Sequence, residues 1–390
     1  MFPSEIAHAL ATAYLGSPLP LRTAGSSQEI NTLGWVVASV PEEAAPRPVS
    51  EEERRATERM LRTLMEAAGG YYAIWTLDLG LVHGFWAILA DRPEGLTPQE
   101  LAARGGWDLR YIETWCRAAY AAGLLEAEEG RFRMAEGLRA PLLEPDSPVY
   151  FGGLVRFLTA LRERFLHLRE HMADGQRSWW DAADPELMEG VADSSRTFYT
   201  RLLRKGFRQV PGLVDRLSQG ALQMVELACG RGIGLVRIAA QYPLLPLAGV
   251  DSDPASLAAA QTGLERAGLA GRVPLTRASF ETGPLPPADV YLVNLALHEA
   301  RNPPGALRTI REHLRPGGVL LVSEFPFPAE LPGLRDPSGR LMSGAQYLEA
   351  TLDDSFLTQE EVVTLLRSAG FRDVGSASLA PVHALIWGWK

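Results

Sequence analysis

Residues Val225 to Gly234 combine an apolar run, an acid and three closely spaced glycines, which makes them the most informative stretch of the chain. The apolar run predicts a buried strand that turns sharply into a helix. Glycine at Gly230, Gly232 and Gly234 permits positive φ and lets a ligand lie against bare backbone, while the following helix offers unpaired N–H groups. The pattern is typical of a nucleotide site, although glycine at such a turn also serves packing alone.

A second apolar strand ends at Asp251, 21 residues after Gly230. An acid at this distance can accept hydrogen bonds from both ribose hydroxyls of a nucleoside held over the first turn. A dinucleotide dehydrogenase would share this feature, but its fingerprint is G-x-G-x-x-G. This turn instead has Ala228 two residues ahead of Gly230, and an acid, Glu226, lies on the strand before it.

The elements that position these residues alternate between strand and helix from Ala221 to the end of the chain. Strands are expected at 223–227, 247–251, 273–277, 288–295, 319–325, 374–378 and 382–389. Such alternation specifies a parallel sheet with helices on both faces. Residues 219–390 are therefore predicted to form an α/β domain.

The sequence before this domain divides into an arm and two helical regions. Residues 1–50 are rich in Pro, Ser and Ala and form an arm. Residues 51–147 contain helix, turn, helix and short hairpin in the order of a winged helix-turn-helix. Residues 148–218 form a helical connector rich in aromatic side chains, which act either as core between domains or as a wall for a flat, apolar ligand.

Composition narrows the class of protein. A hydrophobic fraction of 46% and a charged fraction of 22% fit a soluble globular protein, and no apolar stretch approaches the roughly 20 residues needed to cross a bilayer. The N-terminal residues lack a secretory signal, so we expect a cytoplasmic location and no membrane partner. Residues 91–146 carry 11 acids against 7 arginines, and the whole chain has a net charge of −9, which disfavours a nucleic-acid partner.

No metal site is expected. The two cysteines, Cys116 and Cys229, suit free thiols better than ligands or a disulfide. His167 to His171 match the H-x-x-E-H pattern of a zinc-peptidase family. The segment is nevertheless rich in Arg and Glu, as on a solvated helix face.

Taken together, the motifs of residues 221–390 resemble the class I S-adenosylmethionine-dependent methyltransferases. The turn after the first strand, Asp251, and the Pro316-Gly317-Gly318 turn before Glu324 carry the resemblance. It implies a Rossmann-like sheet, mostly parallel with an antiparallel last strand, and S-adenosylmethionine as cofactor with S-adenosylhomocysteine as product. The residues that it assigns to the cofactor are Glu226, Ala228, Gly230, Gly232, Asp251, Ser252, Ala278, Ser279, Phe280, Asn294 and Ser195.

The chain departs from this family in two places. Ala228 stands where the first glycine usually is. Ala278, Ser279 and Phe280 follow the third strand without the common Asp at the adenine position. Both changes are expected to weaken the cofactor site without abolishing it.

A narrower resemblance covers more of the chain. A winged-helix module, a helical connector and a methyltransferase domain, in this order, look like the bacterial and plant small-molecule O-methyltransferases. That resemblance implies a homodimer formed through the N-terminal domain. It also implies His298 as general base, with Glu324 as the carboxylate that orients it. Phe356 stands where a second such carboxylate is often found.

The hypothesis is methyl transfer from S-adenosylmethionine to a hydroxyl of an apolar, aromatic or polyketide-like small molecule. Such an enzyme must align donor and acceptor and remove the acceptor's proton, for which a histidine suffices. One alternative is a non-methylating enzyme of natural-product biosynthesis, motivated by Phe356 and the altered turn. A second alternative is a winged-helix regulator that binds DNA.

Overall fold

The computed structural model describes residues 50–180 and 185–390. The predicted arm over residues 1–50 therefore lies outside the described residues, apart from Ser50. The chain divides into two compact units, Met1–Ala73 and Ile74–Lys390. A long helix, α2 (Glu51–Val82), begins in the first and ends in the second. Across the two described ranges, no helix is both long and apolar enough to cross a membrane.

The winged helix-turn-helix order is present as predicted. The helices are α3 (Phe85–Ala90), α4 (Pro98–Gly105) and α5 (Leu109–Ala121), and the hairpin pairs β1 (Leu125–Glu128) with β2 (Arg131–Met134). Trp86 and Trp115 are buried in its core, and their indole N–H groups donate to the carbonyls of Leu77 and Thr76, each at 2.9 Å. Because a buried N–H without a partner is costly, these bonds let two large aromatic residues fill one small core.

The connector is mainly helical over its described residues. It contains α6 (Arg139–Leu143), α7 (Gly152–Ala160), α8 (Arg162–His171), α9 (Pro185–Arg201), a π-helical turn (Leu202–Gly206), a 3-10 turn (Phe207–Gln209) and α10 (Leu213–Ser218). A Cβ at Gly153 of α7 would lie 2.4 Å from the carbonyl oxygen of Asp193 in α9. The two helices therefore pack with their backbones in close contact.

The C-terminal domain is a seven-stranded sheet in the order β5-β4-β3-β6-β7-β9-β8. Its strands are β3 (Met224–Leu227), β4 (Leu247–Asp251), β5 (Leu275–Arg277), β6 (Ala288–Asn294), β7 (Leu314–Glu324), β8 (Arg372–Ala380) and β9 (His383–Trp389). The pairs among β3 to β7 are parallel, and β9 runs antiparallel to both β7 and β8. The mostly parallel sheet with an antiparallel last strand is confirmed.

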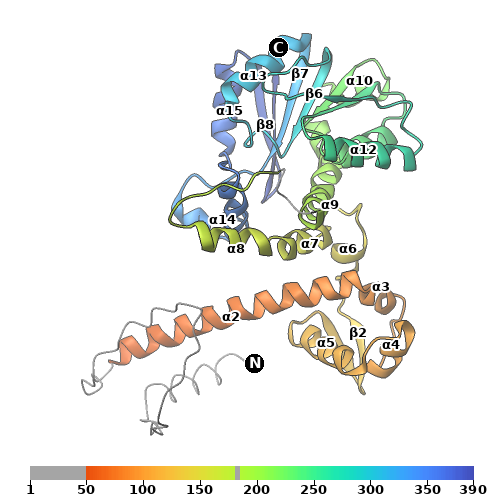
Figure 1. Ribbon diagram of the computed structural model, residues 1–390, viewed down its shortest axis with the longest axis vertical. Coiled ribbons are helices and arrows are strands. Elements are labelled where there is room, and N and C mark those ends of the chain that lie inside the picture. Colours follow the sequence, from red (N-terminus) through yellow and green to blue (C-terminus); the bar gives the residue numbers. More distant parts are fainter. Residues whose placement is uncertain (1–49, 181–184) are drawn as a thin grey trace, which may run out of the picture. The chain divides into compact units, whose positions relative to one another are not determined.

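Helices cover both faces of this sheet (Figure 1). One face packs against α10, α11 (Ile233–Gln241) and α12 (Pro254–Arg266), and the other against α13 (Pro303–His313) and α15 (Gln359–Ser368). Successive residues alternate between the two cores, since Met224 faces the first and Val225 the second. Burial on both faces explains why the strands read as continuous apolar runs.

One long helix of this domain was not predicted. α14 (Pro337–Thr351) follows a 3-10 turn (Leu331–Arg335), and its Leu348 packs with Phe157, Leu161 and Leu187 of the connector. Its buried face also contains Gly339 and Glu349. Such a face lacks the apolar stripe by which an amphipathic helix is recognised in a sequence.

Candidate active site

The turn between β3 and α11 has the backbone that its sequence predicts. Gly230 and Gly232 have φ of 51° and 76°, and Ala228 adopts 51° although it carries a side chain. Gly232 precedes the first residue of α11, and no side chain caps the helix. The first N–H groups of α11 therefore remain available to an anionic or polar ligand.

Ala228 is strained, and replacing it with glycine should stabilise the protein. An L-residue with positive φ costs about 1–2 kcal/mol, part of which glycine loses again through the greater freedom of its unfolded chain. We expect Ala228→Gly to raise the free energy of unfolding by about 0.5–1 kcal/mol, measured by urea denaturation. The matched control is Ala258→Gly on the exposed face of helix α12. This control should lower the free energy of unfolding by about 1 kcal/mol. If Ala228→Gly lowered it by a similar amount, Ala228 would not be strained.

Asp251 ties this turn to the end of β4. Its Oδ2 accepts a hydrogen bond from the backbone N–H of Gly230, and its Oδ1 accepts one from Asp253, both at 2.8 Å. Burial raises the pKa of Asp251, and the two backbone N–H donors oppose that shift. The carboxylate therefore shapes the glycine turn and keeps further lone pairs for a ligand.

Glu226 lies under the turn and is fully buried. The phenol of Tyr199, from α9, donates to its Oε1 at 2.5 Å, whereas Oε2 has no hydrogen-bond partner among the described residues. A Cβ at Gly234 would lie 2.3 Å from Tyr199 Cε1 and 2.4 Å from Glu226 Oε1. Gly234, predicted to give a ligand access to the backbone, instead makes room for this pair. Burial raises the pKa of Glu226 to about 8.

The other residues predicted to bind the cofactor lie at the same end of the sheet or on α9. The backbone N–H of Ala278 donates to the carbonyl of Asp251 at 2.9 Å, so the loop after β5 lies beside the end of β4. Ser252 is exposed next to Asp251, and Ser279 and Phe280 are half-buried. Asn294 ends β6, and the Ser195 hydroxyl donates to the carbonyl of Ala192 within α9 at 2.7 Å. Their part in cofactor binding stays a prediction.

The predicted base, His298, and the carboxylate predicted to orient it, Glu324, lie in direct contact. His298 follows β6 through Leu295, which has a positive φ of 55°. Its Nδ1 lies 2.8 Å from Glu324 Oε2, and Glu324 Oε1 accepts the backbone N–H of Leu297 at 2.9 Å. The carboxylate thus fixes both the loop and the ring, and a proton on Nδ1 leaves Nε2 directed away from Glu324.

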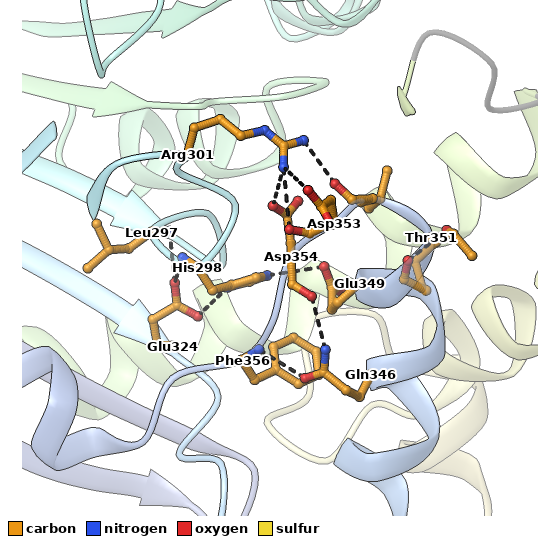
Figure 2. Close-up of polar contacts among 12 residues, drawn as sticks. Leu297, His298, Arg301, Glu324, Gln346, Glu349, Thr351, Asp353, Asp354 and Phe356 are labelled. Atoms are coloured by element: carbon orange, nitrogen blue, oxygen red, sulfur yellow. Dashed lines mark hydrogen bonds and ion pairs between the residues drawn. The ribbon is translucent and has the colours of Figure 1, made fainter. Parts of the chain in front are cut away.

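Nε2 of His298 faces a carboxylate that the sequence did not reveal. Glu349 Oε2, on α14, lies 3.7 Å from His298 Nε2 and has no hydrogen-bond partner among the described residues. Figure 2 shows Glu324 and Glu349 on opposite sides of the imidazole. The carboxylate sought at Phe356 is therefore supplied seven residues earlier in the chain, and Phe356 packs edge-on against the imidazole with ring centroids 5.0 Å apart.

The charges of this group are strongly coupled. Burial by itself would lower the pKa of His298, but the charges of Glu324 and Glu349 outweigh it and raise that pKa to about 10. Burial raises the pKa of Glu349 to about 7 and that of the neighbouring Glu299 to about 8. These shifts favour a protonated imidazole near neutral pH, with the buried Glu349 beside Nε2 as a group that can take up its proton.

Arg301 and Gln346 fix the segment that carries Glu349. Arg301 donates to the carbonyl of Leu352 at 2.9 Å and pairs with Asp354 at 3.3 Å (Figure 2). Gln346 binds the backbone of Asp354 and Phe356. Beside Asp354 lies a cavity of about 360 Å³, between the end of α8 and the end of α14.

The two histidines of the H-x-x-E-H match have other partners. His167 Nε2 lies 2.8 Å from the carbonyl oxygen of Gln176, and His171 Nδ1 lies 3.2 Å from the carboxylate of Asp174. Across the described ranges, no three His, Cys, Asp or Glu side chains gather as a metal site would require.

Comparison with known proteins identifies the fold and its chemistry. A family described as a methyltransferase domain matches residues 225–320. Over 337 residues the chain is 28% identical to 3-hydroxy-5-methyl-1-naphthoate 3-O-methyltransferase of Streptomyces sahachiroi, which covers 81% of this chain and 91% of that protein. A stretch of 171 residues is 32% identical to the ubiquinone/menaquinone biosynthesis C-methyltransferase UbiE of Syntrophotalea carbinolica, 40% of this chain and 70% of that one. The chain belongs to the S-adenosylmethionine-dependent methyltransferases.

A solved relative extends the likeness of this methyltransferase to both domains. The structure of human N-acetylserotonin methyltransferase in complex with SAM superimposes with a TM-score of 0.65 at 20% identity and covers 85% of this chain and 97% of that one. The methyltransferase family match, the Streptomyces O-methyltransferase and this shared fold together confirm the predicted resemblance to the small-molecule O-methyltransferases, with S-adenosylmethionine as cofactor.

The residues of the methyltransferase fit that cofactor. The unpartnered, buried Oε2 of Glu226 is an acceptor beside the glycine turn, and the start of α11 supplies backbone N–H groups that no side chain caps. Glu226 and the turn would hold the methionine part, Asp251 the ribose, and residues 278–280 the adenine. S-adenosylmethionine, when bound, supplies an electrophilic methyl group and a good leaving group.

Proposed function

We propose that the methyltransferase methylates a hydroxyl of an apolar, aromatic or polyketide-like small molecule, with His298 as general base. The observation that carries the proposal is the position of His298 between two carboxylates, with Nδ1 on Glu324 and Nε2 toward Glu349. The acceptor oxygen forms a bond to the methyl carbon while the carbon–sulfur bond breaks and its electron pair stays on sulfur. The hydroxyl proton passes to Nε2 of His298.

Glu349 resolves the difficulty that a histidine with a raised pKa is already protonated. If the proton on Nε2 moves to Glu349, the ring becomes neutral without a change in the number of bound protons. The carboxyl of Glu349 is suited to this because its pKa is raised to about 7 by burial. His298 then offers an Nε2 lone pair to the acceptor, while Glu324 holds the proton on Nδ1.

Aromatic side chains around His298 support a flat, apolar acceptor. Phe325 and Phe356 pack together with ring centroids 4.8 Å apart, and Phe198 of α9 joins them at 5.2 Å from Phe325. Phe327 extends the row at 6.0 Å from Phe356. The connector therefore contributes both to the core and to the aromatic surface beside the base.

The proposal is tested by product analysis. Purified protein is incubated with S-adenosylmethionine that carries a trideuterated methyl group and with hydroxynaphthoates such as the acceptor of the Streptomyces relative. Matched compounds carry an amino group in place of the hydroxyl, or a hydroxyl already blocked by a methyl ether. We expect one labelled methyl per hydroxyl compound and an equal amount of S-adenosylhomocysteine. Methylation of the amino or blocked compounds alone would refute O-methylation.

Removing the charge of Glu349 should move the pH dependence of turnover to lower pH. The neutral form of His298 increases as the pH rises through its pKa, and the negative charge of Glu349 raises that pKa. We expect Glu349→Gln to shift the rising limb of the kcat–pH profile downward by on the order of one to three pH units. Glu360→Gln, on the exposed face of α15, is the matched control. If the rising limb does not shift in Glu349→Gln, the charge of Glu349 does not set the pKa of the catalytic base.

The two alternatives make different demands. Phe356 and the altered glycine turn favour a non-methylating enzyme, and Glu349 removes the first of these two reasons. A DNA-binding regulator is disfavoured by the excess of acids over arginines in residues 91–146, and in the hairpin Arg133 pairs with Glu126 at 2.5 Å and Arg131 with Glu100 at 2.9 Å. The homodimer and the cytoplasmic location stay predictions.

A further inference from the structure

A row of polar side chains crosses the carboxyl-terminal end of the otherwise apolar sheet. It consists of Glu226 on β3, Asn294 on β6, Ser323 on β7 and His383 at the start of β9. Glu226, Ser323 and His383 are fully buried, and Asn294 is 7% exposed. Because buried polar groups are costly unless they are bonded, their bonding pattern requires an explanation.

The donor in each bond of this row follows from the number of protons that each side chain carries. The Ser323 hydroxyl donates its one proton to Asn294 Oδ1 at 2.6 Å. The bond of 2.8 Å between Ser323 Oγ and His383 Nε2 must therefore be donated by the imidazole. Burial, aided by the charges of Arg201 and Lys205, lowers the pKa of His383 to about 3, so the ring is neutral. Its only proton is on Nε2, and Nδ1 has no partner among the described residues.

The same direction continues to the cofactor site. A side-chain hydrogen bond with Asn294 lowers the pKa of the Tyr199 phenol, in opposition to burial. Since Oδ1 is occupied by Ser323, the amide nitrogen is the donor in that bond. Tyr199 in turn donates to Glu226 Oε1 at 2.5 Å. Every donor therefore points toward Glu226, and Oε2 remains as an unpaired acceptor beside the glycine turn.

We propose that His383, Ser323, Asn294 and Tyr199 form a relay of positioning residues that holds Glu226 as the acceptor for the α-ammonium of S-adenosylmethionine. The hydrogen bond that Tyr199 donates favours the charged carboxylate, so it opposes the rise that burial causes in the pKa of Glu226. The amide orientation of Asn294 determines whether Tyr199 donates to Glu226 or turns away from it. Ser323 on β7 and His383 on β9 fix that orientation from the side of Asn294 that faces away from β3. This inference concerns the cofactor alone and is independent of the acceptor.

Equilibrium binding to two ligands tests the relay. One is S-adenosylhomocysteine, and the other is its deaminated analogue, which keeps the carboxylate and lacks the ammonium. The native protein should prefer the first. Tyr199→Phe should lower this preference by about tenfold to a hundredfold, and Ser323→Ala by about threefold to tenfold, measured by titration calorimetry. An equal loss for both ligands, or no loss, would overturn the proposal.

Matched controls separate the relay from general packing. Tyr242→Phe removes a phenol from the same core cluster, and Thr309→Val removes a hydroxyl that donates to the Glu281 carbonyl at 2.9 Å. Both should leave the preference between the ligands unchanged. Nitrogen NMR of the folded protein gives an independent reading, since His383 should carry its proton on Nε2 between pH 5 and 8. A proton on Nδ1 would reverse the relay and refute it. Failure of the hydroxyl-methylation assay would leave these binding results unaffected.

Discussion

Replacing His298 with alanine should lower kcat by a factor of about 10²–10⁴, while the affinity for S-adenosylhomocysteine stays close to that of the native protein. The loss is expected in kcat because the base acts on the acceptor's proton in the transition state. His298 follows β6 and bonds to Glu324 at 2.8 Å, whereas the glycine turn and Asp251, which are predicted to hold the cofactor, belong to the ends of β3 and β4. Steady-state kinetics with the hydroxyl acceptor and calorimetry with the product measure the two quantities.

Two further variants show whether the fall in kcat of His298→Ala reflects a lost base. Glu324→Gln keeps the shape of the side chain but removes the charge that holds the proton on Nδ1, so we expect an intermediate loss of about 10–100-fold. His313→Ala removes a histidine that bonds the Thr309 carbonyl at 2.9 Å at the end of α13, and it should retain native kcat. Near-native turnover in His298→Ala would show that another group, or water, takes the proton.

Much of the fold could be predicted from the sequence for a physical reason. So could the contact between His298 and Glu324, although Glu349 could not. The strands are buried on both faces, so they form apolar runs that end where polar residues begin. β6 and β7 are adjacent and parallel, and Asn294 pairs in register with Ser323. Residues that follow these two positions must then lie at one edge of the sheet. His298 and Glu324 meet for that reason, and the resemblance to the O-methyltransferases identified them as the pair.

Glu349 and Tyr199 could not be found in this way. A carboxylate on a helix normally indicates a face exposed to water, and nothing local to α14 shows that Glu349 turns inward toward His298. Tyr199 was one aromatic residue among many in the connector, and its partner Glu226 lies on β3, in another part of the sequence. Both contacts depend on how distant segments pack, which patterns of three to four residues do not encode.

Gly234 belongs to a correctly recognised glycine motif, but it is a glycine for a reason other than ligand binding. The three glycines were interpreted as one ligand-binding feature. Gly230 has open space where a Cβ would lie, in agreement with that interpretation, whereas a Cβ at Gly234 would collide with Tyr199 and Glu226. The spacing of a glycine motif therefore mixes residues that admit a ligand with residues that admit a neighbouring side chain.

Asp251→Ala should weaken S-adenosylhomocysteine binding by at least about a hundredfold, because the change removes two functions at once. The carboxylate accepts the N–H groups of Gly230 and Asp253, and each such bond to a charged acceptor contributes about 1.5–3 kcal/mol. Its remaining lone pairs are available to the ribose hydroxyls. Asp253→Asn is the matched control, because that carboxylate caps α12 through Ser256 at 2.7 Å.

The two functions of Asp251 are separated by comparing S-adenosylhomocysteine with its 2′-deoxy analogue. If Asp251 binds the ribose, the native protein prefers the hydroxylated ligand and Asp251→Asn loses that preference. If it only shapes the turn, Asp251→Asn weakens both ligands by the same factor, and the assignment of the ribose to Asp251 is wrong. The control Asp253→Asn should keep both the melting temperature and the preference close to those of the native protein, because Asn caps a helix about as well as Asp and the glycine turn stays in place.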